Sequence, residues 1–105
     1  FKDLKRLNFA QAYPTVYVTG ASTIINNLIV DGYDTFDSTS TGLVQHIKIT
    51  NANVKNLIVK RSTMNRANVS NASALVNLTG AAVVNKLSLT DMYSLARSLS
   101  RSISL

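Results

Sequence analysis

The chain has 105 residues, of which 46% are hydrophobic and 15% are charged, and its formal net charge is +6. This length and composition fit one small domain with a packed core and a surface made mainly of Ser, Thr and Asn. Cysteine is absent from the sequence, which excludes disulfide scaffolds, thiolate zinc sites and cysteine nucleophiles. No apolar run approaches the roughly 18 residues that a membrane helix needs, so we expect no membrane span.

Residues 1–15 are expected to form an N-terminal arm or a short helix. Phe1, Leu4 and Leu7 recur at helical spacing among basic residues, and Pro14 would end such a helix. A segment of this kind would dock onto the body of the domain.

An internal repeat dominates residues 16–90. Three similar segments begin at Val16, Ile47 and Val76, so their starts lie 31 and 29 residues apart. Each segment holds an alternating strand, a corner and a second alternating strand, which puts every second side chain on one face. Each corner carries a residue type that tolerates a positive φ, namely Gly20, Asn51 or Gly80.

The second strand of each repeat predicts the core. By the alternation, these residues correspond and point inward: Leu28, Leu57 and Leu87, and then Val30, Val59 and Leu89. Short strands of this kind cannot each bury a face alone, so the repeats are expected to stack on one another.

A finer five-residue period runs through the same region. Residues 52–56 (Ala-Asn-Val-Lys-Asn) and 67–71 (Ala-Asn-Val-Ser-Asn) resemble units of the pentapeptide-repeat family, which place a central apolar residue inward. The longer unit, at residues 18–21 (Val-Thr-Gly-Ala) and 27–30 (Asn-Leu-Ile-Val), resembles repeats of viral and phage fibre, spike and capsid-associated proteins. Both resemblances imply a β-solenoid.

We therefore predict an all-β fold in which residues 16–90 form a parallel β-solenoid (β-helix) of about three coils, three-sided or four-sided. Residues 91–105 are predicted to form a short C-terminal α-helix, as a cap on the last coil or an oligomerisation helix. Asp91 would begin this helix. Its apolar stripe is the candidate assembly surface, made of Met92, Leu95, Leu99 and Ile103.

Charge is unevenly distributed along the chain, and between Ser38 and Thr90 every charged residue is basic. Five of these form the candidate binding face for a polyanion, with a solvated face as the alternative: Lys48, Lys55, Lys60, Arg61 and Arg66. The acidic residues Asp31, Asp34 and Asp37 could ligate Ca²⁺ or lie in an ordinary exposed loop.

His46 is the single histidine and has no acidic residue close in sequence, so it is predicted to be structural or solvated rather than catalytic. We assign no catalytic residue, no metal site and no cofactor. The expected function is that of a non-enzymatic structural component of a virus particle or fibre, in a virion or extracellular assembly. It would contact protein partners or copies of itself. The alternatives are a pentapeptide-repeat interaction module that binds a protein or polyanion, and a carbohydrate-binding or carbohydrate-active β-helix fragment.

Overall fold

The computed structural model describes residues 1–7, 13–37, 45–66, 74–94 and 103–104, and the regular structure in these ranges consists of β-strands. The strands are β1 (Lys5–Leu7), β2 (Val16–Thr19), β3 (Ile24–Asp31), β4 (Asp34–Asp37), β5 (Gln45–Thr50), β6 (Asn53–Arg66), β7 (Ala74–Thr79), β8 (Val83–Ser94) and β9 (Ile103–Ser104). Their richness in Val, Ile and Thr fits the preference of β-branched residues for pleated surfaces.

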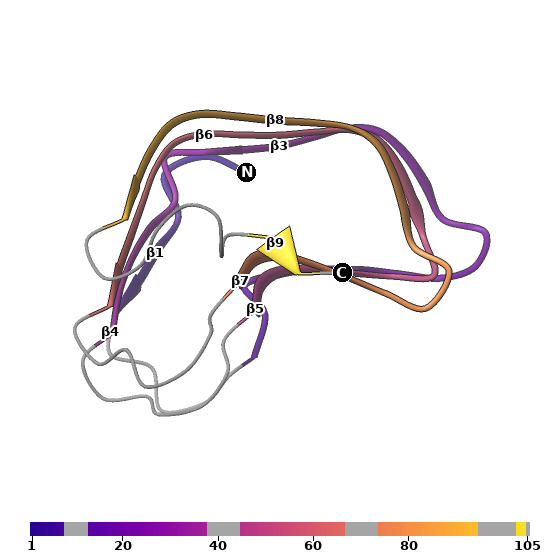
Figure 1. Ribbon diagram of the computed structural model, residues 1–105, viewed down its shortest axis with the longest axis horizontal. Coiled ribbons are helices and arrows are strands. Elements are labelled where there is room, and N and C mark those ends of the chain that lie inside the picture. The colour runs from indigo at the N-terminus through magenta and orange to yellow at the C-terminus, as the bar shows by residue number, and fades with distance from the viewer. Residues whose placement is uncertain (8–12, 38–44, 67–73, 95–102, 105) are drawn as a thin grey trace.

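The strands form two sheets, and every pair is parallel. One sheet has the order β1-β4-β6-β3, with β8 also paired to β6, and the other has the order β2-β5-β7-β9. In Figure 1, β3, β6 and β8 follow nearly the same path along one side of the molecule, and β5 and β7 run along the opposite side. The chain alternates between the two sheets, so that segments about one repeat apart become neighbours.

The alignment of the three repeats is confirmed by the strand register. Val16 pairs with Ile47, which pairs with Val76. In the other sheet the three leucines, Leu28, Leu57 and Leu87, stand side by side. Equivalent positions of successive repeats therefore lie directly beside one another.

The predicted β-solenoid with a C-terminal helical cap is wrong as a description of the fold. The described residues form two parallel sheets around a shared core and contain no helix. Asp91 and Met92 belong to β8, Ile103 belongs to β9, and Leu95 and Leu99 lie outside the described residues. The register with β6 continues through Ser94, so residues 92–94 extend β8 instead of forming a helix after Asp91.

The N-terminal segment also differs from the helical alternative, because Lys5–Leu7 forms strand β1 beside β4. Pairing with β4 gives these backbone groups partners that an isolated turn of helix would lack. Within the described ranges there is no helix that could cross a lipid bilayer.

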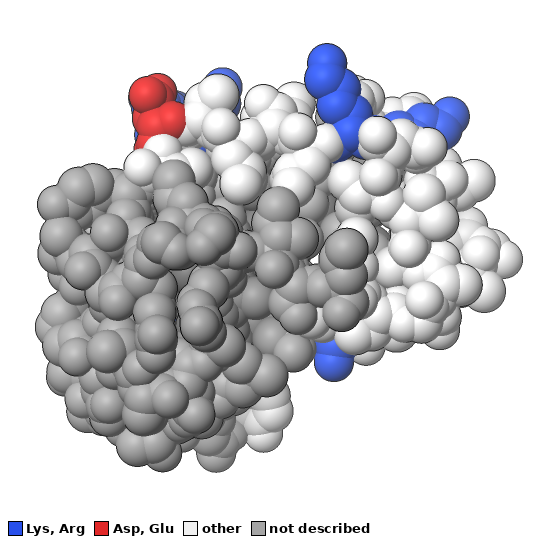
Figure 2. Space-filling model, in the orientation of Figure 1, with Lys and Arg blue, Asp and Glu red and all other residues white. Residues whose placement is uncertain are grey.

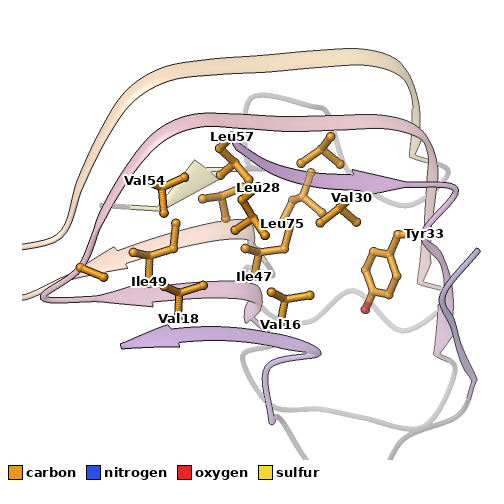
Figure 3. Packing of buried hydrophobic residues seen from close by; sticks show 13 residues of the cluster. Val16, Val18, Leu28, Val30, Tyr33, Ile47, Ile49, Val54, Leu57 and Leu75 are labelled. Carbon is orange, nitrogen blue, oxygen red and sulfur yellow. The ribbon is translucent and has the colours of Figure 1, made fainter. Parts of the chain in front are cut away.

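The core lies between the two sheets (Figure 3) and is built from the alternating apolar positions. Leu57 and Val59 of β6 are completely buried, as predicted. The other buried apolar residues are Val16, Val18, Leu28, Val30, Tyr33, Ile47, Ile49, Ala52, Val54, Leu75 and Val76. Each aliphatic side chain buried in this way contributes about 1.5–3 kcal/mol, so the middle strands carry most of the stability.

Two sets of corner residues have a positive φ. The first set is the predicted one, with φ values of 122° at Gly20, 59° at Asn51 and 62° at Gly80. The second set was not predicted: Asp3 precedes β1, Gly32 lies between β3 and β4, and Arg61 and Asp91 lie within β6 and β8. These corners bend the chain around the core.

Candidate functional site

The five basic residues of the predicted binding face do not lie together. Lys48 is in β5, whereas Lys55, Lys60 and Arg61 are in β6 of the other sheet. Arg66 ends β6, and its side chain lies outside the described part of the structure. Figure 2 shows basic side chains at separate points of the rim, with uncharged surface between them.

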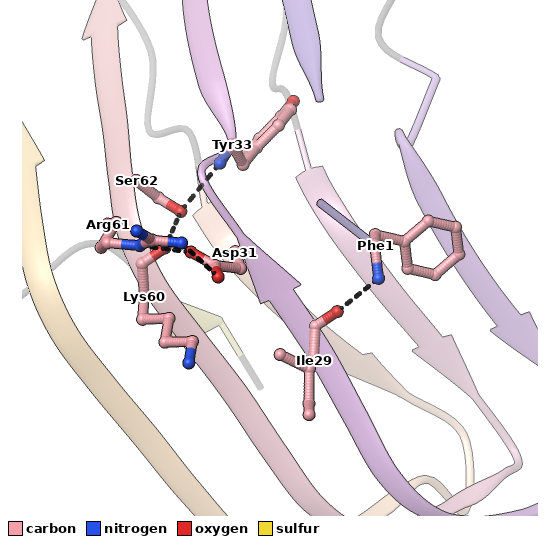
Figure 4. A network of polar contacts seen from close by, with 7 residues as sticks. All are labelled: Phe1, Ile29, Asp31, Tyr33, Lys60, Arg61 and Ser62. Atoms are coloured by element: carbon pink, nitrogen blue, oxygen red, sulfur yellow. Dashed lines mark hydrogen bonds and ion pairs between the residues drawn. The ribbon is translucent and has the colours of Figure 1, made fainter. Parts of the chain in front are cut away.

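Two of these cations have local partners. The ammonium of Lys48 lies 5.8 Å from the centre of the Tyr17 ring, in a cation–π contact. Arg61 binds Asp31 through two hydrogen bonds, Nε to Oδ1 at 2.7 Å and Nη2 to Oδ2 at 2.6 Å (Figure 4). A polyanion would have to compete with the Asp31 carboxylate for Arg61, which weakens the case for this residue as a binding group.

The Arg61–Asp31 pair also bears on the predicted calcium site. Hydrogen bonding from Arg61 lowers the pKa of Asp31, and nearby positive charge acts in the same direction. Asp34 is exposed on β4, and the side chain of Asp37 lies outside the described part. These residues therefore belong to strands rather than to one exposed loop, and no group of metal-ligating residues gathers among the side chains that are described.

A buried polar network connects the two sheets. The hydroxyl of Tyr33 lies 2.7 Å from Nδ1 of His46 and 2.8 Å from Oγ1 of Thr15. Arg6 donates from Nη1 to the same Thr15 oxygen at 2.9 Å. Burial raises the pKa of Tyr33, although the Thr15 hydrogen bond opposes this shift.

The Tyr33–His46 pair is structural, because the two residues are only 1% and 3% exposed and no substrate can reach them. The expectation that His46 is structural or solvated is thus resolved in favour of a buried, hydrogen-bonded imidazole. The backbone of Tyr33 is held as well, since its N–H donates to Oγ of Ser62 at 3.1 Å (Figure 4). Tyr33 and Ser62 were not identified from the sequence, and the only signal is their place at inward positions.

A shallow depression of about 140 Å³ lies on the outer side of β6 and β8. Its lining consists of Asn56, Leu57, Ile58, Lys86 and Ser88. The lining contains no carboxylate or imidazole, the groups that most often perform acid–base catalysis.

The most distinctive surface is the end of the stack at β8. In β6 the inward residues Val54, Leu57 and Val59 are completely buried. Their partners in β8 are only partly buried, and these are Val84, Leu87 and Leu89. Met92, one of the four predicted assembly residues, is likewise partly buried on β8. We call the inward residues of β8, together with the edge that no described strand covers, the β8 end.

Apolar side chains are also exposed on the outer faces. Ile24 and Val83 flank Asn53 in one row and are 64% and 46% exposed. Tyr17 on β2 is 54% exposed. Several large exposed apolar side chains beside an incompletely covered core are typical of a protein-binding surface.

Comparison of the chain with protein families, curated proteins and solved structures found no match.

Proposed function

We propose that the protein is a non-enzymatic structural module that works by assembling with protein partners or copies of itself. The single observation that carries this proposal is the β8 end, where the core side chains of the last strand are left partly exposed. Burying Leu87, Leu89 and Met92 against a partner would supply apolar contact area, which is the main favourable term in association.

Two further features support an assembly role. The chain as a whole is low in charge, at 15% of its residues, which limits the desolvation cost of close contact with protein. The parallel pairing of three successive repeats gives a stiff body that can hold such a surface in a fixed shape. The setting in a virus particle or fibre comes from the resemblance of the repeats alone, and the test below does not depend on it.

The alternatives are less well supported by the geometry. A polyanion-binding module would need its cations on one face, whereas Lys48 and Lys55 lie on different sheets and Arg61 is paired with Asp31. A carbohydrate-active fragment would need two free carboxylates on one face, and Asp31 is held by the same ion pair.

The proposal is tested by sedimentation velocity over a wide range of protein concentration. We expect the native chain to associate, and we expect Leu89→Ser to weaken association while the far-UV circular dichroism stays native. Val59→Ser is the matched control, because it changes the completely buried partner of Leu89 and should unfold the chain instead. A native chain that sediments as an 11.4 kDa monomer at every concentration, alone and in extracts of its source, would contradict the proposal.

A further inference from the structure

Strand β8 is paired on one side only within the described residues. It forms ten registered pairs with β6, and no described strand lies along its other edge. At 12 residues it is long for an edge strand, and natural proteins usually keep such edges short or covered. The open edge of β8 is therefore a candidate site for pairing with another strand.

The pairing of β8 is nearly symmetric about Ser88. Its register with β6 runs over residues 83–84, 86–90 and 92–94, with interruptions at Asn85 and Asp91. Both interruptions lie three residues from Ser88. Figure 1 shows the path of β8 bending down on both sides of its central stretch.

The hydrogen bonds of β6 show which backbone N–H and C=O groups of β8 point toward its open edge. The carbonyl of Lys60 accepts from the N–H of Gly32 at 2.9 Å, so Lys60 faces β3. Successive residues face opposite edges, so Val59 faces β8, and its register partner Leu89 must turn its own N–H and C=O away from β6. The same alternation makes Leu87 face the open edge.

The outer parts of β8 obey the same rule. The N–H of Val83 donates to the carbonyl of Ala52 at 3.0 Å, so Val83 faces β6 and Val84 faces the open edge. The N–H of Thr63 donates to the carbonyl of Tyr33 at 2.8 Å, so Thr63 faces away from β8. Ser62 then faces β8, and its partner Met92 faces the open edge.

We propose that β8 pairs antiparallel with β8 of a second copy, about a twofold axis through Ser88. This inference rests on the proposed function and names its partner and register. Leu87 then stands opposite Leu89 of the second copy, and Val84 opposite its Met92. Both pairs join residues that face the open edge and point their side chains inward, so each can exchange two backbone hydrogen bonds while completing the core.

Charge favours the same register. Lys86 stands opposite Thr90 of the second copy, one residue from its Asp91, so the twofold axis brings a positive and a negative charge near each other twice. The assembly also stops at two copies, because the pairing uses the 12-residue open edge of β8 in each copy once.

Head-to-tail stacking is disfavoured by the opposite end of the molecule. There the edge of β3 is already bonded to the first residues: the amino group of Phe1 donates to the carbonyl of Ile29 at 2.7 Å (Figure 4), and the N–H of Asp3 donates to the carbonyl of Asp31 at 2.8 Å. In a head-to-tail stack the end of β8, from Leu89 onward, would occupy this same position. A second copy can therefore not add its β3 edge to β8 without displacing these contacts.

Ser88→Cys provides the test, because the native chain has no cysteine. In the proposed register position 88 and its copy in the second chain form a pair without mutual hydrogen bonds. Their Cα atoms lie about 4.5 Å apart, within disulfide reach. Ile58→Cys is the matched control: Ile58 is the register partner of Ser88 one strand further in, and its two copies would lie about 14 Å apart.

We expect mild oxidation to convert Ser88→Cys into a covalent dimer that reductant separates, while Ile58→Cys stays monomeric on non-reducing gels. We also expect Lys86→Glu to weaken the native dimer about two- to five-fold, and Lys55→Glu, which changes the net charge equally, to leave it unchanged. Native association without a Ser88→Cys disulfide would overturn the register but leave the assembly role standing. A purified native chain that stays monomeric would overturn the β8 pairing, and one that also stays monomeric in extracts of its source would overturn the proposed function as well.

Discussion

Strands β6 and β8 present nearly the same pattern of side chains to the core, yet they differ in burial. Leu57 and Val59 of β6 are completely enclosed, whereas their partners Leu87 and Leu89 in β8 are only partly buried. The residue types are alike, so the difference comes from position, because β6 has described neighbouring strands on both sides and β8 has one. In a stacked parallel fold, the number of neighbouring strands sets how much a given leucine contributes to stability.

The largest effect is expected when the same side chain is truncated in both strands. Leu57→Ala is expected to lower the free energy of unfolding by about 2–5 kcal/mol, because it leaves a cavity in the centre of the core. Leu87→Ala removes the same atoms from a site that is already partly solvated, so we expect less than half of that loss. Urea unfolding of both variants at low protein concentration measures the difference. Equal losses would mean that β8 is as well covered as β6.

A second effect of burial concerns the ionisation of Tyr33, whose backbone N–H donates to Oγ of Ser62 in β6. Burial raises the pKa of Tyr33 above its usual value near 10. Its stabilising contribution is therefore fully present below about pH 10 and is lost as the pH rises toward the higher folded pKa. Tyr33→Phe should abolish this alkaline loss. At neutral pH it should lower stability by about 1–3 kcal/mol, because Thr15 and His46 each lose a hydrogen-bond partner.

Denaturant unfolding at a series of pH values checks this prediction. Tyr17→Phe is the control, since Tyr17 is exposed on the outer face of β2, and the Thr50 hydrogen bond lowers its pKa rather than raising it. An alkaline stability profile that is the same for Tyr33→Phe and the native chain would disprove the role assigned to burial.

The smallest effect is expected at the second set of corners, where Arg61 in β6 and Asp91 in β8 both have a positive φ. Glycine adopts this conformation freely, so Asp91→Gly should stabilise the fold by up to about 1 kcal/mol. Arg61→Gly should gain less, because it also removes the two hydrogen bonds to Asp31. Thermal unfolding of the two variants ranks them, and a larger gain at Arg61 would show that its ion pair contributes nothing.

The repeat could be read from the sequence because its signal is local and periodic. Alternation identified Leu57 and Val59 as core residues, and the corner chemistry of Gly20, Asn51 and Gly80 identified one set of bends. These features depend only on steric preferences of the residues themselves, so no knowledge of the partners was needed.

The end of β8 was misread because a corner imitates helical spacing. Leu87 and Leu89 are two residues apart, but the bend at Asp91 inserts one residue before the next inward side chain, Met92. A spacing of three is also how an apolar helix stripe begins, and the local sequence does not separate the two. The deciding factor is the pairing of Met92 with Ser62, a contact 30 positions away along the chain. The second set of corners was missed because its positions share no common residue type, and Arg61 in particular is not a typical turn residue.

The first set of corners limits how this chain can evolve. Asn51 fills the space beside Gly80: its Oδ1 accepts a hydrogen bond from the N–H of Ala81 at 2.9 Å, and a Cβ on residue 80 would collide with that oxygen. An asparagine corner therefore demands a glycine corner in the following repeat. Copying the Asn51 repeat alone would place asparagine against asparagine and create the clash, whereas copying a repeat with a glycine corner would not.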